Sequence, residues 1–293
     1  MPLPDAVVDA PPLTQIAYAK INIALHVRAR RDDGYHALES LFVFAEHGDV
    51  LTAKIGPGGD IALDIDGPFA SGLDAGPDNL VMRAALTLQA RCSVPLGAVI
   101  RLTKNLPVAS GIGGGSADAA AALRLLIRLW DVDISRADIA ALALDLGSDV
   151  PACIASVSQL VRGRGEVVER HDVAGLAGSA ILLVNPRVAV STAQVFGGWD
   201  RVDRGALDAA SLRALVEEGR NDLERSAMTI APVIAQVLDV LRGQPGVTLA
   251  RMSGSGATCF AFFEDAPARD AAASAIGARY PDWWTMASRI RQE

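Results

Sequence analysis

The feature that most constrains the fold is a glycine-rich loop between an expected strand and an expected helix. Four of the five residues 111–115 are glycine, and the preceding stretch GAVIRLTKN, residues 97–105, alternates as a strand does. From Ser116 the chain is rich in alanine and leucine, as in a helix. Glycine loses much conformational freedom on folding, so a series of glycines indicates a backbone that must turn sharply or approach something closely.

This loop has the properties of a phosphate-binding site. A helix N-terminus offers unpaired N–H groups and a partial positive charge, and the three glycines 113–115 have no Cβ to obstruct an anion. The Ser116 hydroxyl can bind a phosphate oxygen or a metal ion. A tight turn without a ligand is the alternative. The loop is neither GxxxxGK[ST] nor GxGxxG, because Ser116 stands where the third glycine would be, which disfavours a Walker ATPase and a Rossmann dehydrogenase.

Composition excludes several classes of protein. The chain has 293 residues, of which 51% are hydrophobic and 21% charged, as in a globular protein with a real core. Its net charge of -7 disfavours broad nucleic-acid binding, and its three scattered cysteines favour reduced thiols in a cytoplasmic protein. No apolar run reaches the roughly 20 residues of a membrane span. The acidic, proline-rich residues 1–12 resemble neither a signal nor a transit peptide, and we expect a loose leader there.

The pattern along the whole chain predicts an α+β fold. Strands are expected at 17–27, 38–46, 49–55, 60–66, 97–105 and 179–186, and two more within 247–263. Helices are expected at 77–92, from 116, at 134–146, from about 150, and at 191–196, 209–219 and 230–242. A last helix and strand finish the chain. The expected N-caps are Asp78 or Asn79 for the helix at 77–92 and Ser135 for the helix at 134–146.

Two residues have the chemistry of a phosphoryl-transfer site. A kinase must bring a hydroxyl in line with the terminal phosphate and find an acceptor for its proton, and a carboxylate beside a lysine suits that task. Lys20 lies on the more polar face of the strand 17–27, which we expect to be half-buried, and Asp149 stands between Gly147 and Pro151. Each also has an ordinary interpretation, Lys20 as a solvated strand lysine and Asp149 as a helix N-cap. Spacing alone does not show that they meet.

Three segments in order resemble the GHMP kinase superfamily, which includes homoserine, mevalonate and galactose kinases. They are AYAKINIALHV at 17–27, PVASGIGGGSADAA at 107–120 and MSGSGATCFAFF at 252–263. The longer stretch AKINIALHVRARRDDGYHALESLF, with DNLVMRA and LGSDVP, is similar to the members that phosphorylate a cytidine diphosphate sugar alcohol. The resemblance covers most of the chain, from about Tyr18 to Phe263.

The resemblance implies a two-lobed GHMP kinase fold. The N-terminal lobe, residues 1–165, would be like ribosomal protein S5 domain 2 and carry the ATP loop and the catalytic pair. The C-terminal lobe, residues 166–293, would be ferredoxin-like. ATP, with Mg²⁺, and the sugar alcohol would bind between the lobes of a monomer or homodimer that has no nucleic-acid or membrane partner.

The resemblance also implies a role for each site residue. Asp149 would take the proton from the substrate hydroxyl, and Lys20 would orient and polarise the reacting groups. Asn22, Tyr35, His36, Thr192 and Phe196 would bind the substrate, with the aromatic rings of Tyr35 and Phe196 stacking on cytosine. The residues implied for ATP are Asn79, Lys104, Pro107, Val108, Ala109, Ser110, Gly111, Ile112, Gly113, Gly114, Gly115 and Ser116.

Some residues depart from the family pattern or stay ambiguous. Related loops often have more glycines where this chain has Val108, Ala109 and Ser110. The acid nearest to the loop, Asp118, is expected to be a first-turn helix carboxylate stabilised by the helix dipole, so no magnesium ligand is assigned. The turn at 253–256 is either a plain hairpin or a support of the active site.

Two alternative functions remain open. The first is a GHMP kinase for another alcohol such as homoserine, against which Tyr35, His36 and Phe196 argue, since a small amino acid needs no aromatic clamp. The second is a nucleotide-binding module that has lost its chemistry, against which Lys20 and Asp149 argue.

Overall fold

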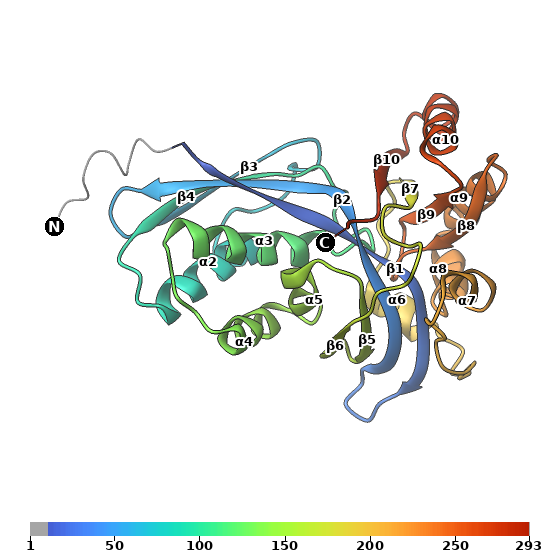
Figure 1. Ribbon diagram of the computed structural model, residues 1–293, viewed down its shortest axis with the longest axis horizontal. Coiled ribbons are helices and arrows are strands. Elements are labelled where there is room, and N and C mark those ends of the chain that lie inside the picture. Colours follow the sequence, from blue (N-terminus) through green and yellow to red (C-terminus); the bar gives the residue numbers. More distant parts are fainter. Residues whose placement is uncertain (1–10, 293) are drawn as a thin grey trace. The chain divides into compact units, whose positions relative to one another are not determined.

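A computed structural model describes residues 11–292, in two compact units (Figure 1). Unit 1 comprises the described residues up to Ala19, His47–Val108 and Gly114–Ala155. Unit 2 comprises Lys20–Glu46, Ala109–Gly113 and the chain from Ser156. The units are interleaved along the sequence, so they do not coincide with two continuous lobes at 1–165 and 166–293, and that boundary stays a prediction. Most of the expected leader lies outside the described residues.

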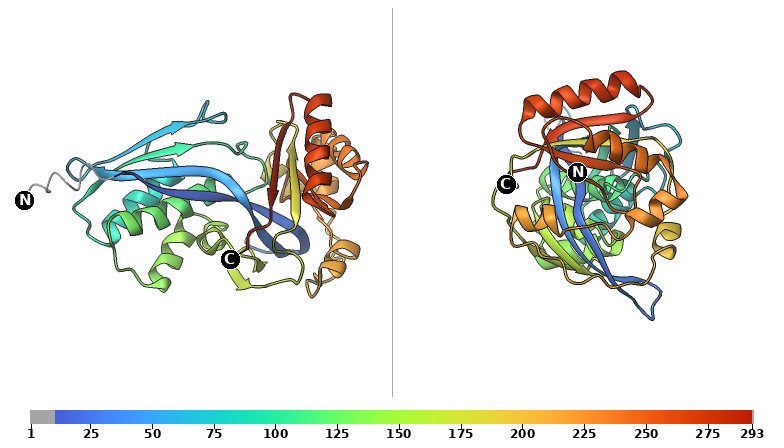
Figure 2. Two further views of the ribbon diagram at one scale, coloured as in Figure 1. Left: turned by 45° about the horizontal axis from the view of Figure 1, so that its top comes forward. Right: turned by 90° about the vertical axis from the view of Figure 1, so that its right-hand side faces the viewer.

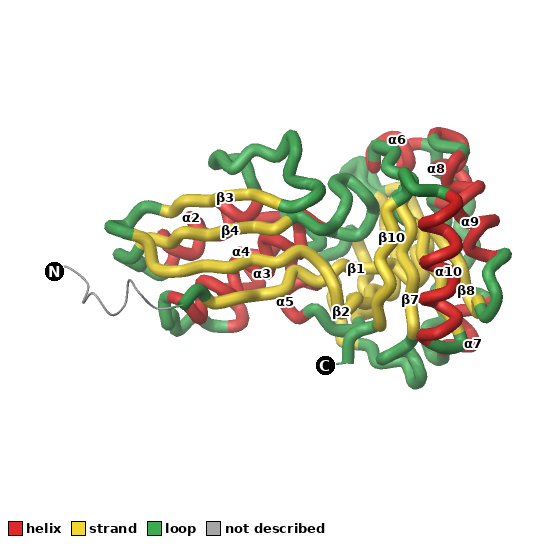
Figure 3. The backbone as a smooth tube through the Cα atoms, turned by 90° about the horizontal axis from the view of Figure 1, so that it is seen from above, coloured by secondary structure: helices red, strands yellow, loops and turns green. Residues whose placement is uncertain are grey.

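Unit 1 is a sheet with helices packed on one face (Figures 1 and 3). Three of its strands, β3 (Ile61–Asp66), β4 (Gly97–Thr103) and the second half of β2 (His36–Gly56), lie in the order β3-β4-β2, and the start of β1 (Leu13–Arg30), up to Ala19, also belongs to this unit. β4 is parallel to β3 and antiparallel to β2. The parallel pair is joined through α2 (Leu80–Arg91), as a crossover connection requires. The other helices are α3 (Gly114–Leu129), α4 (Arg136–Leu146) and α5 (Val150–Ala155).

Unit 2 contains a four-stranded antiparallel sheet in the order β10-β7-β9-β8. Helices α9 and α10 pack on one face of it (Figure 2). The first half of β2 pairs with β5, which pairs with β6. The remaining elements are β1 (Leu13–Arg30, from Lys20 in this unit), β5 (Gln159–Gly163), β6 (Val167–Arg170), β7 (Ala180–Asn185), α6 (Thr192–Gly197), α7 (Leu212–Glu217), α8 (Glu224–Ile230), α9 (Val233–Arg242), β8 (Val247–Met252), β9 (Cys259–Phe263), α10 (Ala266–Arg279) and β10 (Trp284–Arg289).

The predicted α+β class and two of the predicted helix caps are confirmed. The Asn79 side chain accepts from the Val81 N–H at the start of α2, and the Ser135 side chain accepts from the Asp138 N–H at the start of α4. Each cap satisfies an N–H that has no partner within the helix.

Four sequence-based expectations are wrong in detail. The strands expected at 38–46 and 49–55 form one strand, β2, and α8 was not expected. Helix α3 begins at Gly114, two residues before Ser116. The polar face of β1 is not half-exposed: Lys20, Asn22 and His26 are at most 4% exposed. Alternation of polar and apolar residues usually indicates a strand with one solvent-exposed face. Here the polar side chains are buried, and they form hydrogen bonds with other groups of the protein.

No helix within residues 11–292 has both the length and the apolar character needed to cross a membrane.

Candidate active site

In unit 2, the glycine-loop residues 109–113 pack against the turn 253–256 between β8 and β9. The Ser253 hydroxyl donates to the Gly111 carbonyl at 2.9 Å, and the Ser110 carbonyl accepts from the Thr258 N–H at 3.1 Å. Ser253 is fully buried. The glycine-serine turn is therefore more than a plain hairpin, because it is the surface on which this part of the loop rests.

The loop backbone adopts conformations that favour glycine. Gly111 and Gly113 have φ of +77° and +64°, in the left-handed region. Ala109 also lies there, with φ of +51°, at one of the positions where related loops often have glycine. A small side chain is thus accommodated in a conformation that costs a non-glycine residue about 1–2 kcal/mol.

Gly111→Ala is expected to destabilise the protein by about 1–3 kcal/mol through overpacking. A Cβ at this position would lie 2.4 Å from the Ser253 carbonyl oxygen and 2.8 Å from that of Gly256, and both are backbone atoms. Urea denaturation measures the change. Gly197→Ala is the matched control, because a Cβ there meets nothing within 4 Å. Equal stability of the two variants would contradict the close packing of the loop.

Lys20 and Asn22 form a buried polar network beside this part of the loop. The Lys20 ammonium donates to Asn22 Oδ1 at 2.9 Å and lies 4.3 Å from the centre of the Phe42 ring. Asn22 Nδ2 donates to the Ser40 hydroxyl at 2.8 Å, and the Asn22 N–H donates to the Ser253 hydroxyl at 3.1 Å. The network fixes both side chains, as a reacting group requires.

The backbone and stem of Lys20 also contact the loop directly. The Lys20 N–H donates to the Ile112 carbonyl at 3.0 Å. A Cβ on Gly113 would lie 3.0 Å from Lys20 Cε, so glycine at this position leaves room for the lysine stem. The structure thus brings Lys20, Asn22 and the loop residues 109–113 together within one unit.

Asp149 lies in unit 1, directly before α5. It is half-buried, and its carbonyl accepts from the Cys153 N–H at 3.2 Å in the first turn of the helix. Lys20 belongs to unit 2 and Asp149 to unit 1, so the predicted catalytic pair stays a prediction.

Lys104 is buried between two carboxylates of unit 1. Its ammonium donates to Asp49 and, at 2.7 Å, to Asp118. Burial opposes the charge of Lys104, but the two carboxylates outweigh this effect and its pKa is raised. Because α3 begins at Gly114, Asp118 lies in the second turn of the helix, where it is buried and accepts a hydrogen bond from Lys104. The expectation of a first-turn, dipole-stabilised carboxylate is therefore wrong.

The other residues predicted to contact ATP have varied surroundings. Asn79 caps α2 with its oxygen, and its amide donates to the Asp74 carbonyl at 2.8 Å. Pro107 is buried, whereas Val108 is exposed. Gly114, Gly115 and Ser116 lie in the first turn of α3. Their contacts with ATP stay predictions.

Three aromatic rings meet in unit 2 at the predicted cytosine site. The His36 and Phe196 rings are 5.1 Å apart and tilted by 33°, and the Trp199 ring meets His36 edge-on at 5.7 Å. Burial, with a smaller effect of Arg30, lowers the pKa of His36, so its ring is neutral at pH 7 and one nitrogen can accept a hydrogen bond.

Tyr35 and Thr192 are held by neighbours in the same unit. Tyr35 is 61% exposed, and the Arg164 guanidinium lies 5.3 Å from the centre of its ring. Thr192 begins α6 and shares a hydrogen bond of 2.9 Å with the Ser255 hydroxyl. Thr192 therefore contacts the same turn on which the glycine loop rests.

Several supporting residues were not found from the sequence. Asn221 donates to the carbonyls of Met252 and Gly254, both at 2.8 Å, and so holds the turn 253–256. Trp199, Arg164 and Asp49 also contact predicted site residues. Trp199 lies three residues after Phe196, a helical spacing that could have indicated a shared face. Asp49 has no comparable signal, because it contacts Lys104 across 55 positions of the chain.

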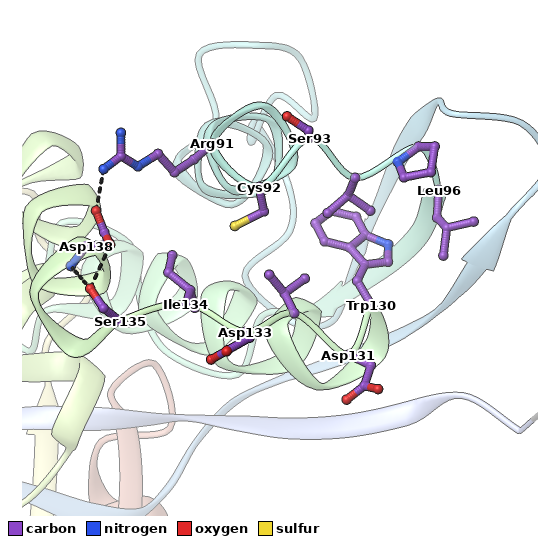
Figure 4. A pocket seen from close by; sticks show the side chains of 13 residues that line it. Arg91, Cys92, Ser93, Leu96, Trp130, Asp131, Asp133, Ile134, Ser135 and Asp138 are labelled. Carbon is purple, nitrogen blue, oxygen red and sulfur yellow. Dashed lines mark hydrogen bonds and ion pairs between the residues drawn. The ribbon is translucent and has the colours of Figure 1, made fainter.

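A hollow of about 550 Å³ lies elsewhere in unit 1, between the end of α2 and the segment 130–138 (Figure 4). Arg91 and Asp138 form an ion pair at its edge, and Cys92 lines it. Cys153 and Cys259, by contrast, are buried. No predicted site residue lines the hollow, so we do not assign it to the reaction.

Two family models match the chain. The one described as GHMP kinases N terminal domain covers residues 79–156, and the one described as GHMP kinases C terminal covers residues 204–282. The first includes the whole glycine loop and Asp149, and the second includes the turn 253–256.

Curated relatives match over nearly the whole chain. A 4-diphosphocytidyl-2-C-methyl-D-erythritol kinase of Rhizorhabdus wittichii is 54% identical over 282 residues, which are 95% of this chain and 94% of the relative. The enzyme of the same name from Sphingopyxis alaskensis is 49% identical over 285 residues, which are 95% of this chain and 99% of that one.

Solved structures agree with these matches. A crystal structure of 4-(cytidine 5'-diphospho)-2C-methyl-D-erythritol kinase is 30% identical, with a TM-score of 0.80 over 96% of this chain and all of that one. A homoserine kinase from Cytophaga hutchinsonii, 17% identical, shares the fold with a TM-score of 0.73 over 97% and 96% of the two chains. The predicted two-lobed kinase fold is confirmed, and the chain belongs to the GHMP kinase family, among the relatives named 4-diphosphocytidyl-2-C-methyl-D-erythritol kinase.

Proposed function

We propose that this protein transfers the γ-phosphate of ATP to the 2-hydroxyl of 4-diphosphocytidyl-2-C-methyl-D-erythritol, a step of the non-mevalonate pathway to isoprenoid precursors. The observation that carries the proposal is the 54% identity over 95% of the chain to a relative of that name. The buried network of Lys20, Asn22 and the glycine loop supports it, because such a network suits a group that must be held in place for catalysis.

In this reaction the loop and the start of α3 bind the phosphates of ATP through backbone N–H groups and the helix dipole. Asp149 accepts the proton of the 2-hydroxyl as the oxygen attacks. Lys20 orients the reacting groups and stabilises the negative charge that develops on the transferred phosphoryl group.

Mg²⁺ belongs to the proposal as the ion that accompanies ATP and neutralises charge on its phosphates. Within residues 11–292, no three His, Cys, Asp or Glu side chains are grouped so that they could hold a metal ion. Asp118, the acid nearest to the loop in sequence, already accepts from Lys104. We therefore assign no residue within 11–292 as a ligand of the ion, which in such sites is often held mainly by the phosphates and water.

We further propose that the protein acts in the cytoplasm, as a monomer or homodimer, on small molecules alone. The three cysteines support a reducing compartment, and the net charge of -7 argues against a nucleic-acid partner.

A substrate panel tests the proposed reaction. Purified protein with ATP and Mg²⁺ is offered the cytidine diphosphate alcohol, homoserine and mevalonate, and ADP release is measured. We expect turnover with the cytidine compound alone. Turnover with homoserine instead would support another GHMP activity, and ATP binding without turnover would indicate a nucleotide-binding module.

Tyr35→Ala is expected to weaken binding of the cytidine substrate by about 1–3 kcal/mol, the usual contribution of a base stacked on an aromatic ring. The KM for ATP should change little. Tyr35→Phe is the matched control, because it keeps the ring and removes only the hydroxyl. An unchanged KM for the cytidine substrate in the alanine variant would count against stacking by Tyr35.

A further inference from the structure

Asp49, Lys104 and Asp118 form a buried triad of ionisable side chains in unit 1, of which only Lys104 has a predicted role, as a contact of ATP. The side chains of Lys104 and Asp118 are each 5% exposed, and that of Asp49 is fully buried. Charged groups are rarely buried unless they are paired, because removing them from water costs several kcal/mol each. We therefore expect the triad to have a role that offsets the free-energy cost of burying these groups.

Asp49 holds the chain where it enters the glycine loop. One carboxylate oxygen accepts from the N–H groups of Asn105, at 2.6 Å, and Leu106, at 2.8 Å, while the other accepts from Lys104. Lys104, Asn105 and Leu106 are consecutive and directly precede Pro107. Hydrogen bonds to a charged acceptor are roughly twice as strong as neutral ones, so Asp49 fixes the backbone at the start of the loop.

The same triad lies against the residue where the loop ends. A Cβ on Gly114 would lie 3.5 Å from the Lys104 ammonium nitrogen and 3.7 Å from Asp49 Oδ2. Gly114 is the first residue of α3, and Asp118 belongs to the next turn of that helix. The triad thus contacts both the last residues before the loop and the first turn after it.

The charge of the triad depends on Asp118. Its Oδ2 accepts from Lys104, whereas its Oδ1 is buried and has no hydrogen-bond partner among residues 11–292. Burial raises the pKa of Asp118 to about 8, against the opposing effect of Lys104. With a proton on Asp118 the triad holds one cation and one anion and is neutral. Loss of that proton gives the triad a net charge of about -1 close to the N-terminus of α3.

The charged groups that act most strongly on Asp118 are the other two members of the triad. The helices α2, α4 and α5 also pack on α3. Their titratable side chains are exposed or half-buried, except for the buried thiol of Cys153: Arg83, Arg91, Arg136, Asp138, Asp145 and Cys153.

We propose that Asp49, Lys104 and Asp118 act together as positioning residues that fix both ends of the glycine loop. Together the three side chains carry no net charge near the N-terminus of α3, and this allows the phosphates of ATP to bind there. The inference rests on the proposed function, since it takes the loop as the ATP site. It assigns to Asp118 the role of a neutral, protonated acid in the working enzyme. ATP affinity should therefore fall as pH rises through the pKa of Asp118.

The test is the Kd for ATP, measured by titration calorimetry at about pH 7.5 and pH 9, because a direct binding measurement does not depend on the second substrate. For the wild type we expect the Kd to rise about 3–10-fold between the two values, the effect of one added negative charge near the phosphates. In Asp118→Asn the side chain at this position cannot ionise, so the ratio of the Kd at pH 9 to the Kd at pH 7.5 should be close to one. Asp133→Asn is the matched control, since Asp133 is exposed and should leave the wild-type ratio unchanged.

A second variant tests positioning at the entry of the loop. Asp49→Glu keeps the charge of the triad but its longer side chain moves the carboxylate away from the two N–H groups, and we expect the KM for ATP to rise about tenfold while kcat stays within about threefold. A purely structural role would lower the fraction of folded enzyme, and hence kcat, without changing KM. A wild-type ratio of the two Kd values in Asp118→Asn, or an unchanged KM for ATP in Asp49→Glu, would overturn the inference. Failure of the wild type to bind ATP at all would instead overturn the proposed function.

Discussion

Replacing Asp149 with asparagine is expected to lower turnover by roughly 10²–10⁴-fold, the usual contribution of a general base. The amide has nearly the same shape as the carboxylate but cannot accept the proton of the substrate hydroxyl. ATP binding should change little, because the predicted role of Asp149 concerns the acceptor alcohol. Steady-state rates with the cytidine substrate, together with the Kd for ATP, measure both effects.

Asp145→Asn is the matched control for this prediction. Asp145 lies four residues earlier, in α4, and is exposed. It loses the same charge at a site with no predicted role, so its turnover should stay near the wild-type value. Turnover near the wild-type value in Asp149→Asn would remove Asp149 from the role of base.

Lys20→Met should lower turnover by roughly 10²–10³-fold, the range found when one preorganised electrostatic group is removed. Methionine can fill much of the space of the lysine stem beside Gly113 and Phe42, but it carries no charge. The loss should fall on kcat more than on the KM for ATP, because Lys20 is predicted to act on the reacting groups. Initial rates at several ATP concentrations separate the two parameters.

The structure offers a second lysine for comparison. Lys54 lies in β2 with an exposed side chain, so Lys54→Met removes the same charge from the surface and should have little effect. Similar rates for the two variants would show that the ammonium of Lys20 is dispensable, and the proposed mechanism would then fail.

Local features of the fold were predictable because they depend on residues close in the sequence. Asn79 and Ser135 cap their helices as expected, since a cap needs only a side-chain oxygen and an N–H two or three residues later. The order strand, glycine loop, helix was also predicted, although β4 ends at Thr103 and not at residue 105, and α3 begins at Gly114 and not at Ser116. Glycines are poor helix formers in general, but in the first turn they leave N–H groups accessible.

Long-range partners were not predictable from the pattern. The alternation of β1 indicated a wet face, yet Lys20 and Asn22 are buried because Ser40 and Ser253 supply hydrogen bonds from distant segments. Asp118 was interpreted from its own helix alone, and the hydrogen bond that it accepts from Lys104 depends on where β4 ends relative to α3. Nor does spacing in the sequence bring Lys20 and Asp149 together, which is why their pairing rests on resemblance to a family.

The unequal burial of the three cysteines has a practical consequence. Cys92, at the end of α2, is partly accessible, whereas Cys153 and Cys259 are enclosed and burial raises the pKa of the Cys259 thiol. Since only the thiolate reacts readily, a maleimide fluorophore would label the native protein at Cys92, beside a hollow that no predicted site residue lines. The enclosed thiols would be labelled only during excursions to open states, so the slow phase of labelling would report how often the protein unfolds.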